Sequence, residues 1–167
     1  ERGDHYGAIS DYTKAIEINP QDESSYYNRG ISKRKLNDYY GAISDYTKAI
    51  EVNPQKVKAY YNRGNVKDDL NDYYGAISDY TKAIEIDPQY ADAYNNRGHI
   101  KTKLKDYYGA ISDFAIAIEI DPQDGMSFSN SGIVKEKIGD LQGACSDWLN
   151  GSYLGYQKAS NLYREKC

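Results

Sequence analysis

Small and polar side chains recur along this chain at a fixed interval of 34 residues. Alanine, glycine, aspartate and proline each form a column at this interval. The columns are Ala8, Ala42, Ala76, Ala110 and Ala144; Gly30, Gly64, Gly98 and Gly132; Asp4, Asp38, Asp72, Asp106 and Asp140; and Pro20, Pro54, Pro88 and Pro122. Columns that share one period identify an internal repeat, whose units bury a continuous core by stacking.

Each unit predicts two helices, which cover roughly residues 23–36 and 39–52 in the best-preserved unit. Asp38 stands just before the second helix, where its carboxylate can cap free backbone N–H groups. The second helix ends at Asn53, because a residue that precedes proline leaves the helical region. Gly30 lies inside the first helix, where glycine is unfavourable, so we expect a close helix–helix approach there.

The repeat divides the chain into six segments and predicts an all-α solenoid of antiparallel helix pairs. We expect residues 1–22 to be the second half of a truncated repeat, followed by complete repeats at 23–56, 57–90 and 91–124, a degenerate repeat at 125–158 and a capping helix at 159–167, within an amphipathic stretch at 157–166. Terminal repeats of a stack are expected to depart from the pattern because they cap it.

Composition excludes several classes of function. The net charge is −4 with both signs interspersed, whereas a nucleic-acid surface needs a concentrated basic stripe. No stretch reaches the roughly 18 apolar residues of a membrane span. His5 and His99 lie far apart, and no catalytic arrangement or phosphate-binding loop is present, so we expect no enzyme activity, no metal and no cofactor.

The residues Tyr26, Gly30, Tyr39, Ala42, Tyr46, Ala49 and Pro54 resemble the signature of the tetratricopeptide repeat in its bacterial form. The resemblance implies a right-handed superhelix in which the first helices line a concave groove that binds a protein or peptide. The partner-binding residues that it implies are Tyr27, Asn28, Ile31, Tyr61, Asn62, Asn65, Asn95, Asn96, His99 and Asn130.

An asparagine column at positions 28, 62, 96 and 130 is the sharpest feature of this surface. An amide both donates and accepts, so a ladder of asparagines could hold the backbone of an extended ligand. The alternative is that the asparagines brace neighbouring helices. A carboxylate clamp of the kind that captures chaperone tails is not expected, because Tyr27, Tyr61 and Asn95 stand where that clamp has lysine.

Charged columns predict a series of partly buried ion pairs. Arg29, Arg63 and Arg97 recur on the first helices, and Asp11, Asp45, Asp79, Asp113 and Asp147 recur on the second helices. Ser131 replaces the arginine in the last repeat, so Asp113 or Asp147 is expected to lack a partner. The lysines four residues after this arginine column are expected to pack their stems and to extend their ammonium groups into solvent.

Cys145 and Cys167 are expected to approach each other if the terminal helix folds back, and whether they form a disulfide stays open. A disulfide favours an oxidising compartment. The location is not fixed by the sequence: the cytoplasm is slightly favoured, and a periplasmic or exported location is the alternative. Three roles also remain open: a non-catalytic interaction scaffold, which leads; a substrate-presenting domain of a larger enzyme; and a module that self-associates through its N-terminal edge.

Overall fold

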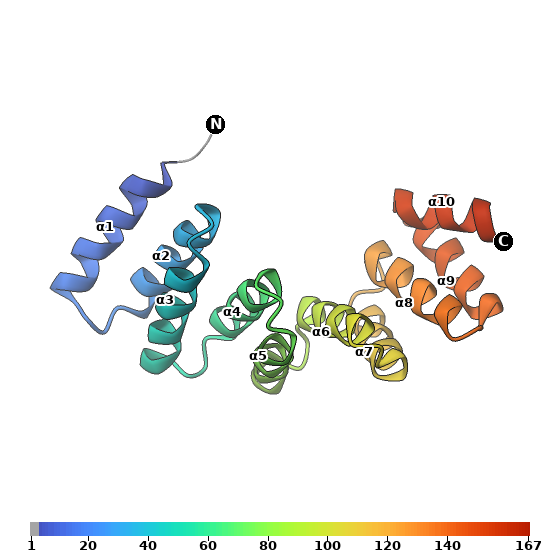
Figure 1. Cartoon of the computed structure of the whole chain (residues 1–167), viewed down its shortest axis with the longest axis horizontal. Helices are drawn as coiled ribbons and strands as arrows, with labels where there is room; N and C mark the ends of the chain where they lie inside the picture. The colour runs from blue at the N-terminus through green and yellow to red at the C-terminus, as the bar shows by residue number, and fades with distance from the viewer. Residues whose placement is uncertain (1–3) are drawn as a thin grey trace. The chain divides into compact units, whose positions relative to one another are not determined.

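The computed structural model describes residues 4–167, and every regular element within that range is a helix (Figure 1). The helices form two compact units, Glu1–Asp87 and Pro88–Cys167. Helices of the first unit are α1 (His5–Ile18), α2 (Glu23–Lys35), α3 (Tyr39–Val52), α4 (Val57–Asp69) and α5 (Tyr73–Ile86). Those of the second unit are α6 (Ala91–Lys103), α7 (Tyr107–Ile120), α8 (Gly125–Lys137), α9 (Leu141–Tyr153) and α10 (Gln157–Lys166).

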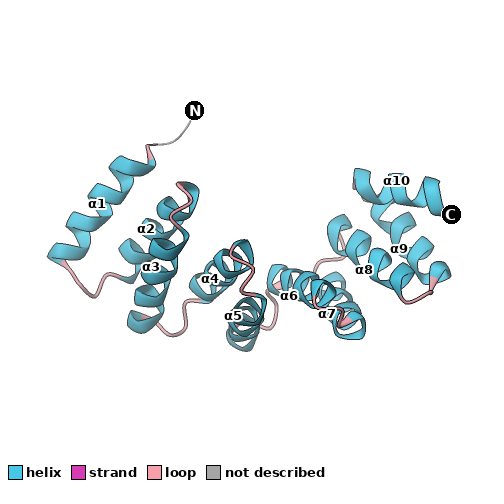
Figure 2. Cartoon of the chain, in the orientation of Figure 1, coloured by secondary structure: helices cyan, strands magenta, loops and turns pink. Residues whose placement is uncertain are grey.

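Short loops join consecutive helices, which pack in pairs (Figure 2). The pairs α2–α3, α4–α5, α6–α7 and α8–α9 each consist of a first and a second helix of one repeat. This confirms the predicted all-α, solenoid-type stacking of helix pairs. The predicted bounds 39–52 and 157–166 agree with α3 and α10, and α2 ends at Lys35, one residue before the predicted end.

The aspartate column caps the second helices as the sequence predicts. Asp38 accepts a hydrogen bond from the backbone N–H of Gly41 at 3.0 Å, and the same contact is made by Asp4, Asp72, Asp106 and Asp140 at the other second helices. Asn53 has an extended backbone and ends α3 before Pro54. The helix ends are therefore fixed by local chemistry that repeats with the sequence.

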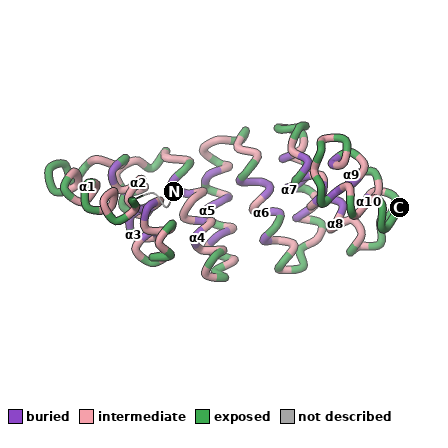
Figure 3. Tube along the Cα trace, turned by 90° about the horizontal axis from the view of Figure 1, so that it is seen from above, coloured by how far each residue is buried: buried purple, intermediate pink, exposed green. Residues whose placement is uncertain are grey.

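The core of each pair forms where glycine of the first helix faces an aromatic ring of the second. A Cβ atom on Gly30 would lie 2.8 Å from Cε1 of Tyr46, so only glycine permits this approach. Ala42 and Ala49 flank Tyr46, and all three are fully buried. Figure 3 shows that such buried positions run along the inner faces of the paired helices. Large side chains beside small ones produce this dense packing.

Candidate protein-binding surface

A buried ion centre holds the two helices of each complete repeat together. Arg29 on α2 donates two hydrogen bonds to the carboxylate of Asp45 on α3, at 2.7 and 2.9 Å. Lys33 contacts the same carboxylate at 2.8 Å. The hydrogen bonds to Asp45 raise the pKa of the Arg29 guanidinium. Because Asp45 is only 2% exposed, a partner cannot reach this ion centre. Its role is to fix the register in which the two helices pack.

The same centre recurs in the next two repeats with equal geometry. Arg63 and Lys67 contact Asp79, and Arg97 and Lys101 contact Asp113, with N–O distances of 2.7 and 2.8 Å in each case. The expectation that the lysine ammonium groups extend into solvent is therefore wrong. Each lysine lies one turn after the arginine, so its side chain reaches the same carboxylate.

The last repeat keeps only part of this centre. Lys135 contacts Asp147 at 2.7 Å, and Ser131 stands in place of the arginine. The prediction that Asp113 or Asp147 lacks a partner is thus wrong, because Lys135 supplies the charge. Asp147 nevertheless has one cationic partner among the described residues, where Asp45, Asp79 and Asp113 have two each.

The arginines also connect successive repeats of the first unit. Nη1 of Arg29 donates to Oγ1 of Thr13 on α1 at 3.0 Å, and Arg63 donates to Thr47 on α3 at the same distance. One guanidinium therefore joins the second helix of the preceding repeat to the aspartate of its own repeat. At the α7–α8 junction both partners of this link are replaced, by Ala115 and Ser131.

Three polar contacts join the first helices α2 and α4 in the first unit. Lys56 Nζ lies 3.1 Å from Glu23 Oε1 and 5.3 Å from the centre of the Tyr27 ring. Nδ2 of Asn62 donates to Oη of Tyr27 at 2.8 Å. The third contact joins Arg34 to Asp69 at 2.9 Å. Burial raises the pKa of Tyr27, against the lowering effect of the Asn62 hydrogen bond, so Tyr27 stays protonated and accepts this bond.

The remaining predicted residues of the first unit differ in their accessibility. Asn28 is half-buried, and its side-chain amide has no hydrogen-bond partner within residues 4–167. Ile31 packs against the core cluster of Ala42 and Tyr46. Asn65 accepts a hydrogen bond from Oη of Tyr80 at 2.7 Å. Of these three side chains, the Asn28 amide is the one that can bind a partner without breaking a contact between the described residues.

Contacts with other aromatic rings position Tyr27 and Tyr61, the residues that precede Asn28 and Asn62. Tyr27 and Tyr61 tilt against Tyr46 and Tyr80 respectively, with ring centres 5.9 Å apart in each pair. Both Tyr27 and Tyr61 are half-buried, so one part of each ring packs inward and the other part faces outward. Rings held in this way offer contact area with little rotamer entropy left to lose.

The corresponding surface of the second unit is built from a buried polar network. Nδ2 of Asn95 on α6 donates to Asp124 at 3.0 Å and to Ser127 Oγ at 2.6 Å. Oδ1 of Asn95 accepts from Nδ2 of Asn130 on α8 at 3.0 Å. Asn95 is 3% exposed, so its amide is used between the helices and a partner cannot reach it.

Asn130 is half-buried, Asn96 is half-buried, and His99 is exposed on α6. The contacts Asn62–Tyr27 and Asn130–Asn95 both join an asparagine of the column to the preceding first helix. These two asparagines therefore brace neighbouring helices, as the alternative interpretation of the column expected. Each of these bonds uses one N–H group of the asparagine amide. In Asn62 the second N–H group and the amide oxygen have no hydrogen-bond partner among the described residues.

Sequence reasoning missed the residues that complete both networks. Glu23 and Lys56 in the first unit, and Asp124 and Ser127 in the second, occupy repeat positions whose residue type changes from unit to unit. A search for columns that keep their residue type passes over such positions. Paired change at two columns, from Tyr27 with Lys56 to Asn95 with Asp124, is the signal that could have revealed them.

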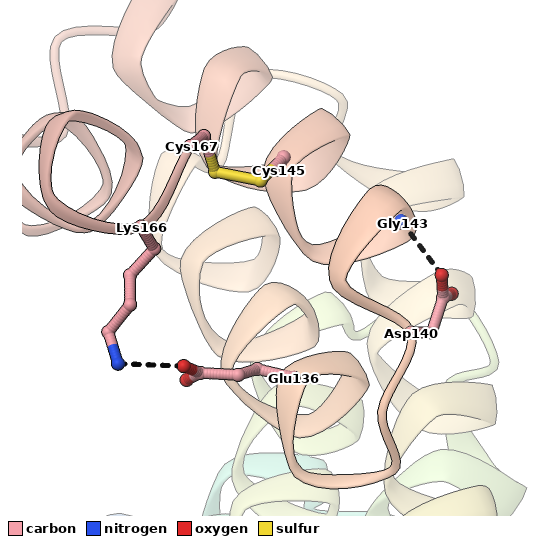
Figure 4. The surroundings of a disulfide bond; sticks show 6 residues. All are labelled: Glu136, Asp140, Gly143, Cys145, Lys166 and Cys167. Carbon is pink, nitrogen blue, oxygen red and sulfur yellow. Dashed lines mark hydrogen bonds and ion pairs between the residues drawn. A yellow bond between two sulfur atoms is a disulfide. The ribbon is translucent and has the colours of Figure 1, made fainter.

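The C-terminal helix is fastened by a disulfide between Cys145 on α9 and Cys167 (Figure 4). Lys166 adds an ion pair to Glu136 on α8 at 2.8 Å. Ala159 is fully buried, and a Cβ atom on Gly151 would lie 2.8 Å from its Cβ. The question of the two cysteines, left open by the sequence, is thereby answered for this structure in favour of a disulfide.

Within residues 4–167 no helix is long and apolar enough to cross a membrane. The same residues contain no group of three or more histidine, cysteine, aspartate or glutamate side chains placed to hold a metal ion.

Repeated helix pairs with a glycine–aromatic core define an all-α helical-repeat protein. Family models give the particular class: the tetratricopeptide repeat model matches residues 24–56, 57–90 and 91–124, and a second TPR repeat model matches residues 1–33. The chain belongs to the tetratricopeptide repeat family. This repeat fold indicates a protein–protein interaction scaffold and is typically non-catalytic.

Solved structures agree with this fold. A crystal structure of MamA is 23% identical, with a TM-score of 0.87, and the match covers 95% of this chain and 92% of that chain. MamA 41-end from Desulfovibrio magneticus RS-1 is 20% identical with a TM-score of 0.85, covering 93% of this chain and 88% of that one. A comparison with curated protein sequences gives no match. At these identities the likeness shows the fold alone.

Proposed function

We propose that this protein is a non-catalytic scaffold whose first helices bind an extended segment of a partner protein. The observation that carries the proposal is the amide of Asn28 on α2, which is half-buried and has no hydrogen-bond partner within residues 4–167. Its repeat equivalent Asn62 is fixed by Tyr27 and keeps its oxygen and one N–H group for a ligand. An extended peptide offers alternating N–H and C=O groups that suit such amides.

Two tyrosine side chains that neighbouring residues already hold in place support this proposal. The Tyr27 ring is fixed by Tyr46, Lys56 and Asn62, so little conformational entropy is lost when a ligand packs against it. The Tyr61 ring packs against Tyr80 as the Tyr27 ring packs against Tyr46. The proposed contacts in the first unit are therefore Tyr27, Asn28, Ile31, Tyr61, Asn62 and Asn65.

The second unit contributes a different surface to the proposal. Asn96, His99 and Asn130 are the residues proposed to contact a partner there, each being at least partly exposed. Asn95 is assigned to the internal network and is left out of the proposed contacts. A polar surface of this kind favours hydrogen bonding to a peptide backbone over burial of large apolar side chains.

Peptides selected from a random library against the whole chain provide a probe for this surface. We expect Asn28→Ala to weaken the selected peptides about fivefold, because one hydrogen bond contributes about 1 kcal/mol. Isothermal titration calorimetry measures the dissociation constants. Asn28 makes no side-chain contact that folding requires, so its substitution reports on binding rather than on stability.

A matched pair at the neighbouring repeat separates binding from bracing. Asn62→Ala removes the amide together with its bond to Tyr27, whereas Tyr27→Phe removes the same bond and keeps the amide. We expect Asn62→Ala to weaken binding several-fold more than Tyr27→Phe does. Equal losses in both variants, or selected peptides that are insensitive to Asn28→Ala and Asn62→Ala, contradict the proposal.

A further inference from the structure

A buried tyrosine hydroxyl in the first complete repeat has no hydrogen-bond partner within residues 4–167. It is Oη of Tyr46 on α3, whose side chain is 0% exposed. Tyr80 stands in the same column on α5 and is 1% exposed, and its hydroxyl donates to Oδ1 of Asn65 on α4 at 2.7 Å. Both rings contact a first-helix tyrosine at 5.9 Å between ring centres, so the two sites differ in the acceptor alone.

The missing acceptor belongs to a known position of the repeat. Ile31 stands one repeat before Asn65 and has no polar atom in its side chain. In both pairs the glycine of the first helix would place a Cβ atom 2.8 Å from Cε1 of the tyrosine ring, so the helices meet in the same way. The Tyr46 hydroxyl therefore points toward Ile31 as the Tyr80 hydroxyl points toward Asn65. A buried donor without an acceptor costs free energy, which an acceptor from a ligand would recover.

This hydroxyl lies directly under the first-helix surface of the first unit. Burial raises the pKa of Tyr46, against the lowering effect of Arg34, so the hydroxyl keeps its proton and acts as a donor. Ile31 lies one turn after Asn28, whose amide also has no partner within residues 4–167, and Arg34 lies one turn further along α2. Ile31 and Arg34 are both half-buried, so a ligand on this surface has only surface side chains between itself and the hydroxyl.

A neutral amide oxygen fits this place better than other acceptors. In the second repeat the carboxamide of Asn65 already fills the role. A carboxylate would lose its hydration there, and the nearest cation, Arg34, is already paired with Asp69. The backbone carbonyls of an extended ligand stay at the level of the asparagine amides, whereas a side chain can reach further in.

We propose that Tyr46 is the donor of a side-chain subsite on the first-helix surface, and that the partner segment places an asparagine or glutamine carboxamide there. The amide oxygen accepts from the Tyr46 hydroxyl once Ile31 moves aside. This inference rests on the proposed function, because the same segment is held by Asn28 and Asn62. The subsite selects partner segments by sequence, which hydrogen bonds to a peptide backbone do not.

Parallel selections test the subsite. A random peptide library is selected against the whole chain and against Tyr46→Phe, which removes only the hydroxyl. We expect asparagine or glutamine to be enriched at one peptide position with the unsubstituted chain and not with the variant. Tyr80→Phe is the matched control: its hydroxyl is already bonded to Asn65, so this variant is expected to keep the enrichment.

Calorimetry then measures the contact with one selected peptide and its leucine counterpart. Replacing the enriched carboxamide residue by leucine is expected to weaken binding to the unsubstituted chain about tenfold, because the hydroxyl loses its acceptor. The two peptides are expected to bind Tyr46→Phe equally, which is the signature of a direct contact in a double-mutant cycle. Ile31→Asn places an amide where the second repeat has Asn65, so it is expected to remove the preference too.

Thermal unfolding without a peptide tests the unpartnered hydroxyl itself. Tyr46→Phe breaks no hydrogen bond between the described residues, so its melting temperature is expected to stay equal or to rise. Tyr80→Phe removes the bond to Asn65 and is expected to lower the melting temperature. An equal fall for both variants would show that the Tyr46 hydroxyl is already satisfied in the free protein, and this would overturn the inference.

Binding results can overturn the inference in two ways. Selection without enrichment of a carboxamide, or a leucine peptide that binds as tightly as its parent, removes the subsite. If Asn28→Ala still weakens the selected peptides, the proposed function stands and only the subsite is lost. A chain that selects no peptide at all removes the first-helix binding surface and the subsite together.

Discussion

In the pair α4–α5 the aspartate of the second helix has two cationic partners, whereas in α8–α9 it has one. Arg63 and Lys67 both contact Asp79, and Lys135 alone contacts Asp147. The aromatic residue that faces the glycine changes as well, from Tyr80 to Trp148. The pair that loses an ionic contact thus gains apolar ring area. The first helices α4 and α8 keep the same bounds relative to the repeat, and α9 ends one residue earlier than α5 does.

The comparison shows that an ionic contact in one repeat can be replaced by a larger aromatic ring in another. The indole of Trp148 is fully buried and donates from Nε1 to the backbone oxygen of Ser129 at 3.3 Å. Buried ion pairs contribute little net free energy relative to apolar packing, because removing charges from water is costly. Replacement of the arginine by serine is therefore tolerated where a larger ring fills the interface.

The largest expected effect comes from removing the carboxylate in each pair. Asp79→Asn leaves Arg63 and Lys67 without a counter-charge and is expected to lower the free energy of unfolding by about 3 kcal/mol. Asp147→Asn leaves only one cation, Lys135, without its counter-charge and is expected to cost about 2 kcal/mol. Urea-induced unfolding followed by circular dichroism measures both, and equal costs would remove the distinction between the pairs.

An effect of similar size is expected at one of the two glycines, and a smaller effect at the other. A Cβ atom on Gly132 would lie 2.5 Å from Nε1 of Trp148 and 3.0 Å from the backbone oxygen of Ala144, whereas one on Gly64 would lie 2.8 Å from Cε1 of Tyr80. Gly132→Ala is therefore expected to cost about 3 kcal/mol and Gly64→Ala about 1–2 kcal/mol. Thermal unfolding of both variants checks the order, and a greater loss for Gly64→Ala contradicts the packing argument.

Two polar side chains next to these rings are expected to act in opposite directions. Asn65→Leu takes the acceptor from Oη of Tyr80 and is expected to destabilise the protein by about 1–2 kcal/mol. Ser129 has a fully buried hydroxyl without a hydrogen-bond partner among residues 4–167, so Ser129→Ala is expected to stabilise the protein by about 0.5–1 kcal/mol. Urea midpoints that move in the same direction for both variants would refute this contrast.

The smallest expected effect lies in the turns between first and second helices. Asn71 and Gly139 adopt positive φ angles of 61° and 86° in the two pairs, and Lys105 adopts 64° in the repeat between them. Lysine carries a steric cost in this region that glycine does not, so Lys105→Gly is expected to raise stability by up to about 1 kcal/mol. A melting temperature that falls on this substitution would show that the Lys105 side chain is needed elsewhere.

Much of the fold could be predicted from the sequence because its determinants are local and repeated. Asp38 caps α3, Asn53 ends it, and Gly30 marks the closest approach of α2 and α3. The partners of the charged residues were predicted less well. Lys33 lies one turn from Arg29, but only the packed pair shows that both side chains reach Asp45.

The candidate site was predicted as a column of residues, without the contacts between them. The bond from Asn62 to Tyr27 joins residues 35 positions apart, and the network around Asn95 includes residues that break the repeat. Burial of Asn95 and accessibility of Asn28 follow from how neighbouring helices pack, and the repeat pattern gives both positions the same expected role.

The sequence by itself determined the helices, their ends and their pairing, because capping, proline and glycine act within one repeat. Only the tertiary structure decided which partners the repeated positions find on neighbouring helices. Asn62 and Asn130 stand in the same column of the repeat, yet Asn62 donates to Tyr27 and Asn130 donates to Asn95. The physical reason is that these hydrogen bonds depend on the helix that packs alongside, and the residues within one repeat do not specify what that helix presents.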